Sequence, residues 1–215
     1  MFSREVHAYY ASTSVTSKGQ VMAFKKRAAL SQVSASLMLA LAFQAAAADL
    51  PKDVQAQLPK GFEVMQSRTG PQPGDHRESL LVVVHQATDT REQPSPRPLL
   101  IFERQGDGAF RLVARNDTVV LRADQGGQCD PFEDADEGLA VKGLYFTVEN
   151  AVSCGSHWSD FVTFRYDASA GKWLFSSEIL TSSFPLEGKP DKTSVTRANK
   201  ASPVSFADWR SEHSP

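Results

Sequence analysis

Ser156, His157 and Asp160 are the residue types of a hydrolytic triad, and they lie close together in the sequence. A triad needs its nucleophile, base and orienting carboxylate on separate elements, so that the three side-chain tips can meet. Neighbouring residues of an extended segment instead point to opposite faces, and the chain contains no G-x-S-x-G elbow. We therefore expect a surface loop here and predict no catalytic residue.

A second group of candidate ligands is the stretch 130–138, Asp-Pro-Phe-Glu-Asp-Ala-Asp-Glu-Gly, which we call the acidic loop. Carboxylates two residues apart, such as Asp134 and Asp136, can converge on one cation in a calcium loop. A complete EF-hand loop also needs an acidic residue at its start and a bidentate glutamate at its end, and this register is absent. The stretch predicts a solvated loop between two strands.

Histidine spacing argues against a zinc site. The histidines after residue 48 are His76, His85, His157 and His213. None has another histidine at H-x-H or H-x-x-x-H spacing, and His85 ends an apolar run typical of a strand. The sequence therefore predicts no metal site and no cofactor.

The N-terminal part has the three regions of a secretory signal peptide. Lys25-Lys26-Arg27 forms a basic start, residues 33–43 form an apolar stretch, and Ala46-Ala47-Ala48 precedes the expected cleavage before Asp49. The apolar stretch is shorter than the roughly 20 residues that span a bilayer. No cysteine stands directly after it, so a lipid anchor has no attachment point.

Removal of the N-terminal residues changes the charge balance of the chain. We expect residues 22–48 to be the signal peptide and residues 1–21 to be an extension from a start codon assigned too early. The remaining chain keeps 18 basic and 24 acidic residues. This balance argues against binding to nucleic acid or to an anionic membrane by charge alone. We expect a periplasmic or secreted protein with no stable membrane anchor.

Cys129 and Cys154 are the chain's two cysteines. In an exported protein two cysteines normally pair, and a reactive thiol or a metal site would need neighbours that the sequence does not show. We predict a disulfide, whose loop of roughly 26 residues would stabilise the fold by about 3–4 kcal/mol in the chain-entropy model.

Runs of β-forming residues recur after residue 60 and are separated by glycine and proline turns. The runs at 80–84 and 99–102 are continuously apolar, as expected for strands covered on both faces. Gly106-Asp107-Gly108 predicts a hairpin turn. The sequence predicts an all-β fold, a single antiparallel β-sandwich or strongly curved sheet over residues 49–181, after a short helical stretch within 52–58. The expected strands are 62–66, 80–85, 99–103, 110–114, 118–122, 139–141, 145–149, 161–166 and 173–175.

Residues 182–215 form a segment in which proline, lysine, serine, threonine and asparagine dominate as far as Pro203. Phe206 and Trp209 are too apolar for a solvated end, so we expect them to dock this polar C-terminal segment on the domain.

The runs RPLLIFERQGDGAFRLVARND (97–117), GGQCDPF (126–132), LYFTVENAVSCGSHW (144–158) and FVTFRYD (161–167) resemble a family of uncharacterised exported bacterial proteins. In such relatives the segment equivalent to 74–84 is similar to an integrin-type calcium loop. Only Gly74 and Asp75 of that pattern are present, so the loop is degenerate and we expect no calcium there. The resemblance implies export and no particular chemistry.

Three functions stay open, and the first is favoured. It is a non-enzymatic exported β domain that binds a partner protein or a glycan of the cell envelope through loops tethered by the disulfide. The second is an inhibitor or immunity-type protein that acts on a periplasmic hydrolase, and the third is a hydrolase. The candidate binding residues are Asp130, Asp134, Asp136, His157, Trp158 and Asp160.

Overall fold

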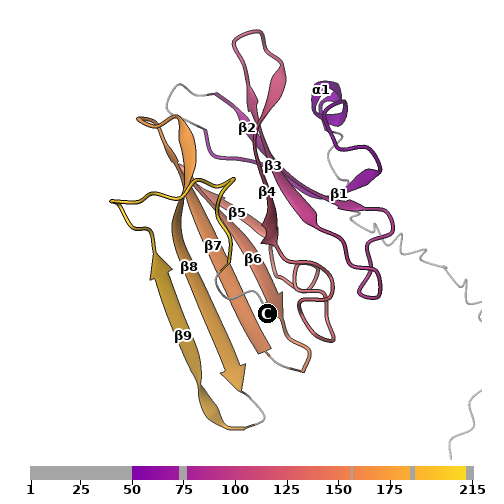
Figure 1. Cartoon of the computed structure of the whole chain (residues 1–215), viewed down its shortest axis with the longest axis vertical. Helices are drawn as coiled ribbons and strands as arrows, with labels where there is room; N and C mark the ends of the chain where they lie inside the picture. Colours follow the sequence, from indigo (N-terminus) through magenta and orange to yellow (C-terminus); the bar gives the residue numbers. More distant parts are fainter. Residues whose placement is uncertain (1–49, 73–76, 156, 185–186, 212–215) are drawn as a thin grey trace, which may run out of the picture. The chain divides into compact units, whose positions relative to one another are not determined.

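The computed structural model describes residues 50–72, 77–155, 157–184 and 187–211 (Figure 1). The expected extension and signal peptide, the degenerate calcium loop at Gly74 and Asp75, and Ser156 lie outside the described residues.

The described chain is almost entirely β, which confirms the predicted fold class. It forms two antiparallel sheets, one with the strand order β1-β2-β3-β4 and one with the order β5-β6-β7-β8-β9, consistent with a β-sandwich. One short helix precedes them. The elements are α1 (Lys52–Gln55), β1 (Phe62–Thr69), β2 (Ser79–Gln86), β3 (Arg97–Arg104), β4 (Phe110–Val120), β5 (Leu139–Lys142), β6 (Tyr145–Val152), β7 (His157–Asp167), β8 (Lys172–Phe184) and β9 (Lys189–Arg197).

Two hydrophobic cores lie on the two faces of the first sheet. On one face Leu81, Val83, Leu99 and Ile101 pack with second-sheet residues such as Phe146. On the other face the alternate residues of the same strands pack with Val54 of α1; these are Val82, Val84, Leu100 and Phe102. The strands β2 and β3 are therefore covered on both sides, which confirms the prediction from their continuous apolar runs.

The β3–β4 connection is the predicted hairpin. The backbone N–H of Gln105 donates to the carbonyl of Ala109 at 2.8 Å, and the N–H of Gly108 donates to the carbonyl of Gln105 at 2.9 Å. Gly108 has φ of +82°, a conformation that favours glycine.

Several strands are longer than the sequence predicts. The expected strands 110–114 and 118–122 are one strand, β4, because its pairing with β3 continues past the register shifts near Leu99 and Ile101. β7 begins at His157 because β6 pairs with it back to Val152 and Trp158. The expected loop at 157–160 is therefore strand.

The segment after residue 181 also differs from the expected polar segment. β8 continues to Phe184, and residues 189–197 form β9, which pairs with β8 at Ile179 and Val195. Nearly every β9 side chain is exposed, and within the described chain β9 pairs only with β8, so it is an edge strand. Its polar composition hid it, since strand prediction relies on apolar alternation.

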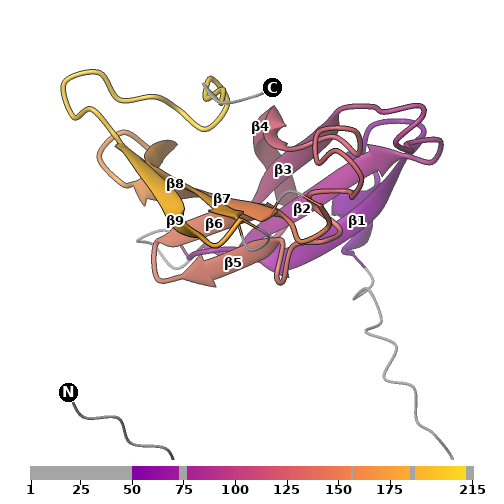
Figure 2. The same ribbon diagram turned by 90° about the horizontal axis from the view of Figure 1, so that it is seen from below.

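Residues 198–211 arch back from β9 toward β4 (Figure 2). Phe206 and Trp209 are 1% and 5% exposed and lie in the core between the sheets. The buried amide of Asn116 on β4 donates to the carbonyl of Phe206 at 2.6 Å and to that of Trp209 at 3.0 Å. Its oxygen accepts from the backbone N–H of Val119, so one side chain joins the β4 backbone to the C-terminal segment.

Candidate functional site

A solvent-open pocket of about 330 Å³ lies where the acidic loop crosses β1 and β2, and we call it the acidic pocket. Its exposed carboxylates are Glu133, Asp136 and Glu137, and Phe132 is its buried aromatic residue. The full lining is Met65, Gln66, His85, Phe132, Glu133, Ala135, Asp136, Glu137 and Gly138. Carboxylates beside the apolar side chains of Met65 and Phe132 suit a long side chain with a cationic head.

Side chains of β1 hold the far end of the acidic loop. The amide of Gln66 donates to the carbonyl of Glu137 at 2.7 Å. The guanidinium of Arg68 donates to the carboxylate of Glu137 at 2.9 Å and also to the carbonyl of Leu139. Gly138 passes so close that an added Cβ would lie 2.5 Å from the Gln66 amide oxygen. Glu133 and Asp136 therefore carry the charges of the pocket that no described side chain neutralises.

A buried ion-pair network holds the near end of the acidic loop. The Arg97 side chain is 2% exposed; its Nε donates to Asp89 at 2.6 Å, and its Nη1 donates to Asp130 at 2.6 Å. Asp130 also accepts from the backbone N–H groups of Phe132 and Glu133, which fixes the first turn of the loop. Burial raises the pKa of Asp130, but the hydrogen bonds and charge of Arg97 outweigh burial and hold that pKa below its ordinary value.

The network extends to the pocket wall. Nδ1 of His85, a lining residue, lies 3.8 Å from a carboxylate oxygen of Asp89. The Asp89 carboxylate also accepts from the backbone N–H of Ser95 at 2.6 Å. Residues on β2, on β3 and in the acidic loop are thus joined by consecutive polar contacts.

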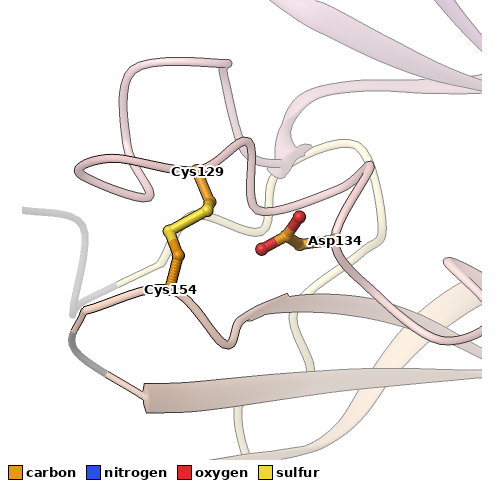
Figure 3. A group of neighbouring side chains, drawn as sticks. All are labelled: Cys129, Asp134 and Cys154. Carbon is orange, nitrogen blue, oxygen red and sulfur yellow. A yellow bond between two sulfur atoms is a disulfide. The ribbon is translucent and has the colours of Figure 1, made fainter.

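Cys129 and Cys154 form the predicted disulfide, with a Cα–Cα distance of 6.1 Å. Cys129 directly precedes the acidic loop and Cys154 follows β6, so the bond ties the loop to the second sheet. The carboxylate of Asp134 turns toward the two sulfur atoms (Figure 3). Its oxygen and both sulfurs lie within 4.8 Å of one another.

Asp160 is buried on the inward face of β7, the face that also carries Val162 and Phe164. Its side chain is 6% exposed, and Oδ1 has no hydrogen-bond partner among the described residues. Burial and, as the smaller contribution, the nearby charge of Glu178 on β8 together raise the pKa of Asp160 to about 7. Asp160 is therefore a buried carboxyl on the core side of β7, and it does not line the acidic pocket.

The structure divides the sequence-predicted binding residues into separate places. Asp136 lines the acidic pocket, Asp130 anchors the acidic loop, and Asp134 faces the disulfide. His157 and Trp158 are half-buried residues of β7, and neither lines the pocket. His157 and Asp160 stand three positions apart on the strand, so they point to opposite faces and cannot act as a base and its orienting carboxylate.

Sequence reasoning missed the residues that complete the pocket. Met65, Gln66 and His85 are far from the acidic loop in sequence. The pairing of β1 with β2 places these three residues near one another, and the hydrogen bond from Gln66 to Glu137 joins them to the loop. Arg97 left a trace in the sequence, because a charged residue begins an otherwise apolar strand. A buried arginine at such a position needs carboxylate partners.

In the described part of the chain, no helix is long and apolar enough to cross a membrane. Comparison of the chain with protein-family models, curated proteins and solved structures gives no match.

Proposed function

We propose that this chain is an exported, non-enzymatic binding domain whose acidic pocket takes a cationic side chain from a segment of a partner protein. The observation that supports this most is the placement of Glu133, Asp136 and Glu137 around one pocket that Met65 and Phe132 also line. A volume of about 330 Å³ is at the low end for ligand sites, and it suits one lysine or arginine side chain better than a large ligand.

Rigidity also supports a binding function. The acidic loop is held at its near end by Arg97 and by the disulfide, and at its far end by Gln66 and Arg68. A loop that is already ordered loses little conformational entropy when a partner binds, so more of the contact energy becomes affinity.

A protein partner is favoured over a glycan. Glycan sites present open aromatic faces, whereas the pocket's aromatic residue, Phe132, is 6% exposed. Carboxylates at the rim speed the approach of a positively charged partner and choose it by charge. The disulfide is typical of an oxidising compartment, which agrees with a periplasmic or secreted location.

The test measures binding of a fluorescently labelled lysine-rich peptide by anisotropy, with a glutamate-rich peptide of equal length as the negative probe. The wild-type chain should bind only the lysine-rich peptide, and more weakly at high salt because screening weakens exposed charge pairs. The double variant Glu133→Lys/Asp136→Lys should lose this binding.

The matched control is Asp191→Lys, which reverses an exposed charge on β9 instead. It should bind the lysine-rich peptide as the wild type does. Equal binding by the double variant and the wild type would remove the acidic pocket as the binding surface. If the acidic pocket is the binding surface, the wild type should capture a partner from a periplasmic extract and the same double variant should not. A hydrolase as the captured partner would indicate the inhibitor function.

A further inference from the structure

Three side chains of metal-binding type converge outside the acidic pocket. Sγ of Cys129, Sγ of Cys154 and a carboxylate oxygen of Asp134 lie within 4.8 Å of one another (Figure 3). The cysteines stand on two separate segments, and Asp134 comes from the acidic loop. Within the described chain this is the one such group of three or more histidine, cysteine, aspartate or glutamate side chains.

Among the described residues, the carboxylate of Asp134 has no hydrogen-bond or ion-pair partner. The backbone N–H of Asp134 donates to the carbonyl of Asp130 at 2.9 Å, which places the side chain beside the sulfurs. Its carboxylate makes no hydrogen bond or ion pair with another described residue, although the loop holds Asp130 and Glu137 in such contacts. Oxidised sulfurs offer a carboxylate no cation and no proton donor, so the disulfide itself gives this group nothing to bind.

The spacing suits a tetrahedral metal ion once the sulfurs separate. Zinc–sulfur bonds of about 2.3 Å and zinc–oxygen bonds of about 2.0 Å place two sulfurs about 3.8 Å apart and each sulfur about 3.5 Å from the oxygen. The cysteine Cα atoms are 6.1 Å apart, and the oxygen already lies within 4.8 Å of both sulfurs. Side-chain rotations of about 1–2 Å at the tips therefore convert the disulfide into a three-ligand site.

We propose that the reduced form of this chain binds one Zn²⁺ through Cys129, Cys154 and Asp134, with the fourth position open to water. A dithiol reductant transfers two electrons and two protons to the disulfide, which becomes two thiols while the reductant closes into its own disulfide. Zn²⁺ then displaces the two thiol protons and takes Asp134 as an ionised carboxylate. Oxidation by a disulfide compound reverses the sequence and releases the metal.

This site keeps the acidic loop tied in both oxidation states. In the oxidised chain the covalent bond joins residue 129 to residue 154, and in the reduced chain the metal joins the same two residues together with Asp134. Two thiolates and one carboxylate form a borderline-soft set that suits Zn²⁺ better than Ca²⁺ or Mg²⁺, which need only hard oxygen ligands.

The experiment uses the full mature chain, reduced without oxygen and titrated first with Co²⁺ and then with Zn²⁺ against a chromophoric chelator. The reduced chain should bind one metal ion, with a thiolate-to-cobalt charge-transfer band that Zn²⁺ abolishes. The oxidised chain should show no such band. Absence of the band in the reduced chain, or loss of its near-ultraviolet circular dichroism on reduction, would overturn the proposal.

The decisive variants are Asp134→Ala and its matched control Asp191→Ala, which changes an exposed aspartate on β9 instead. Loss of a residue that supports a metal ligand weakens metal binding about tenfold or more. Asp134→Ala removes a ligand itself, so it should weaken Zn²⁺ binding by at least about tenfold. Asp191→Ala should bind Zn²⁺ as the wild type does. Equal affinity of Asp134→Ala and the wild type would show that two cysteines bind the metal without a built site, and it would overturn the proposal.

Discussion

Asp160→Asn should stabilise the fold, and the gain should grow with pH. Replacing the buried carboxyl by an amide of the same shape removes a group that cannot ionise in the folded state without cost. Burial, with a smaller contribution from the charge of Glu178, raises the pKa of Asp160 from 3.8 to about 7. This change of about three units, at 1.36 kcal/mol per unit, is worth about 4 kcal/mol.

The sign follows from proton binding in the two states. Below pH 3.8 both states hold the proton, and Asp160 has no effect on stability. Between pH 3.8 and about 7 the unfolded chain loses the proton while the folded chain keeps it, so the free energy of unfolding falls as pH rises. Above about pH 7 both states have lost the proton, and the free energy of unfolding falls no further on account of Asp160.

The assay is urea denaturation of the wild type and Asp160→Asn from pH 5 to pH 8. The variant should be more stable by roughly 1–2 kcal/mol at pH 5 and by about 4 kcal/mol at pH 8. Asp191→Asn, on the exposed strand β9, is the matched control and should track the wild type at every pH. A stability difference between Asp160→Asn and the wild type that stays constant with pH would refute the reasoning.

The other predictions concern the groups that hold the loops in place. Arg97→Ala leaves two buried carboxylates without their cation and should lower the free energy of unfolding by about 3–5 kcal/mol in urea. Arg115→Ala, which removes an exposed pair with Asp117, should cost no more than about 1 kcal/mol, and equal costs for the two variants would contradict the network. Cys129→Ser/Cys154→Ser should lower the free energy of unfolding by about 3–4 kcal/mol, measured in the same way, and an unchanged denaturation midpoint would show that the bond does not restrict the unfolded chain. Asn116→Ala strips partners from several buried backbone groups and should cost on the order of 3 kcal/mol, with tryptophan fluorescence reporting release of the C-terminal segment; an unaltered emission spectrum and stability would count against that contact.

The fold class could be read from the sequence because apolar runs mark buried strands directly. Continuous runs in β2 and β3 predicted cover on both faces, and the two cores confirm it. β9 could not be read in this way. Its side chains are exposed, so its strand structure depends on backbone pairing with β8, which leaves no apolar pattern.

The candidate site was predictable only in part, because a pocket requires register and long-range pairing. Asp136 was identified as a possible ligand from its acidic surroundings, and it does line the pocket. Asp160 looked similar in sequence, yet the pairing of β7 with β6 turns it inward. Two aspartates that look alike in the sequence thus differ in role because one lies in a loop and the other on the inward face of a strand. Residue type alone does not show this difference.

The edge strand β9 carries features that disfavour its pairing with a second copy of the chain. An incoming strand needs a row of free backbone N–H groups, but Pro190 lacks one, and Lys189, Asp191 and Lys192 surround it with charge. A second copy that paired along residues 189–192 would have to bury these charges and would miss the hydrogen bond that Pro190 cannot donate. The 189–192 end of β9 therefore disfavours growth of the second sheet by addition of another strand at this edge.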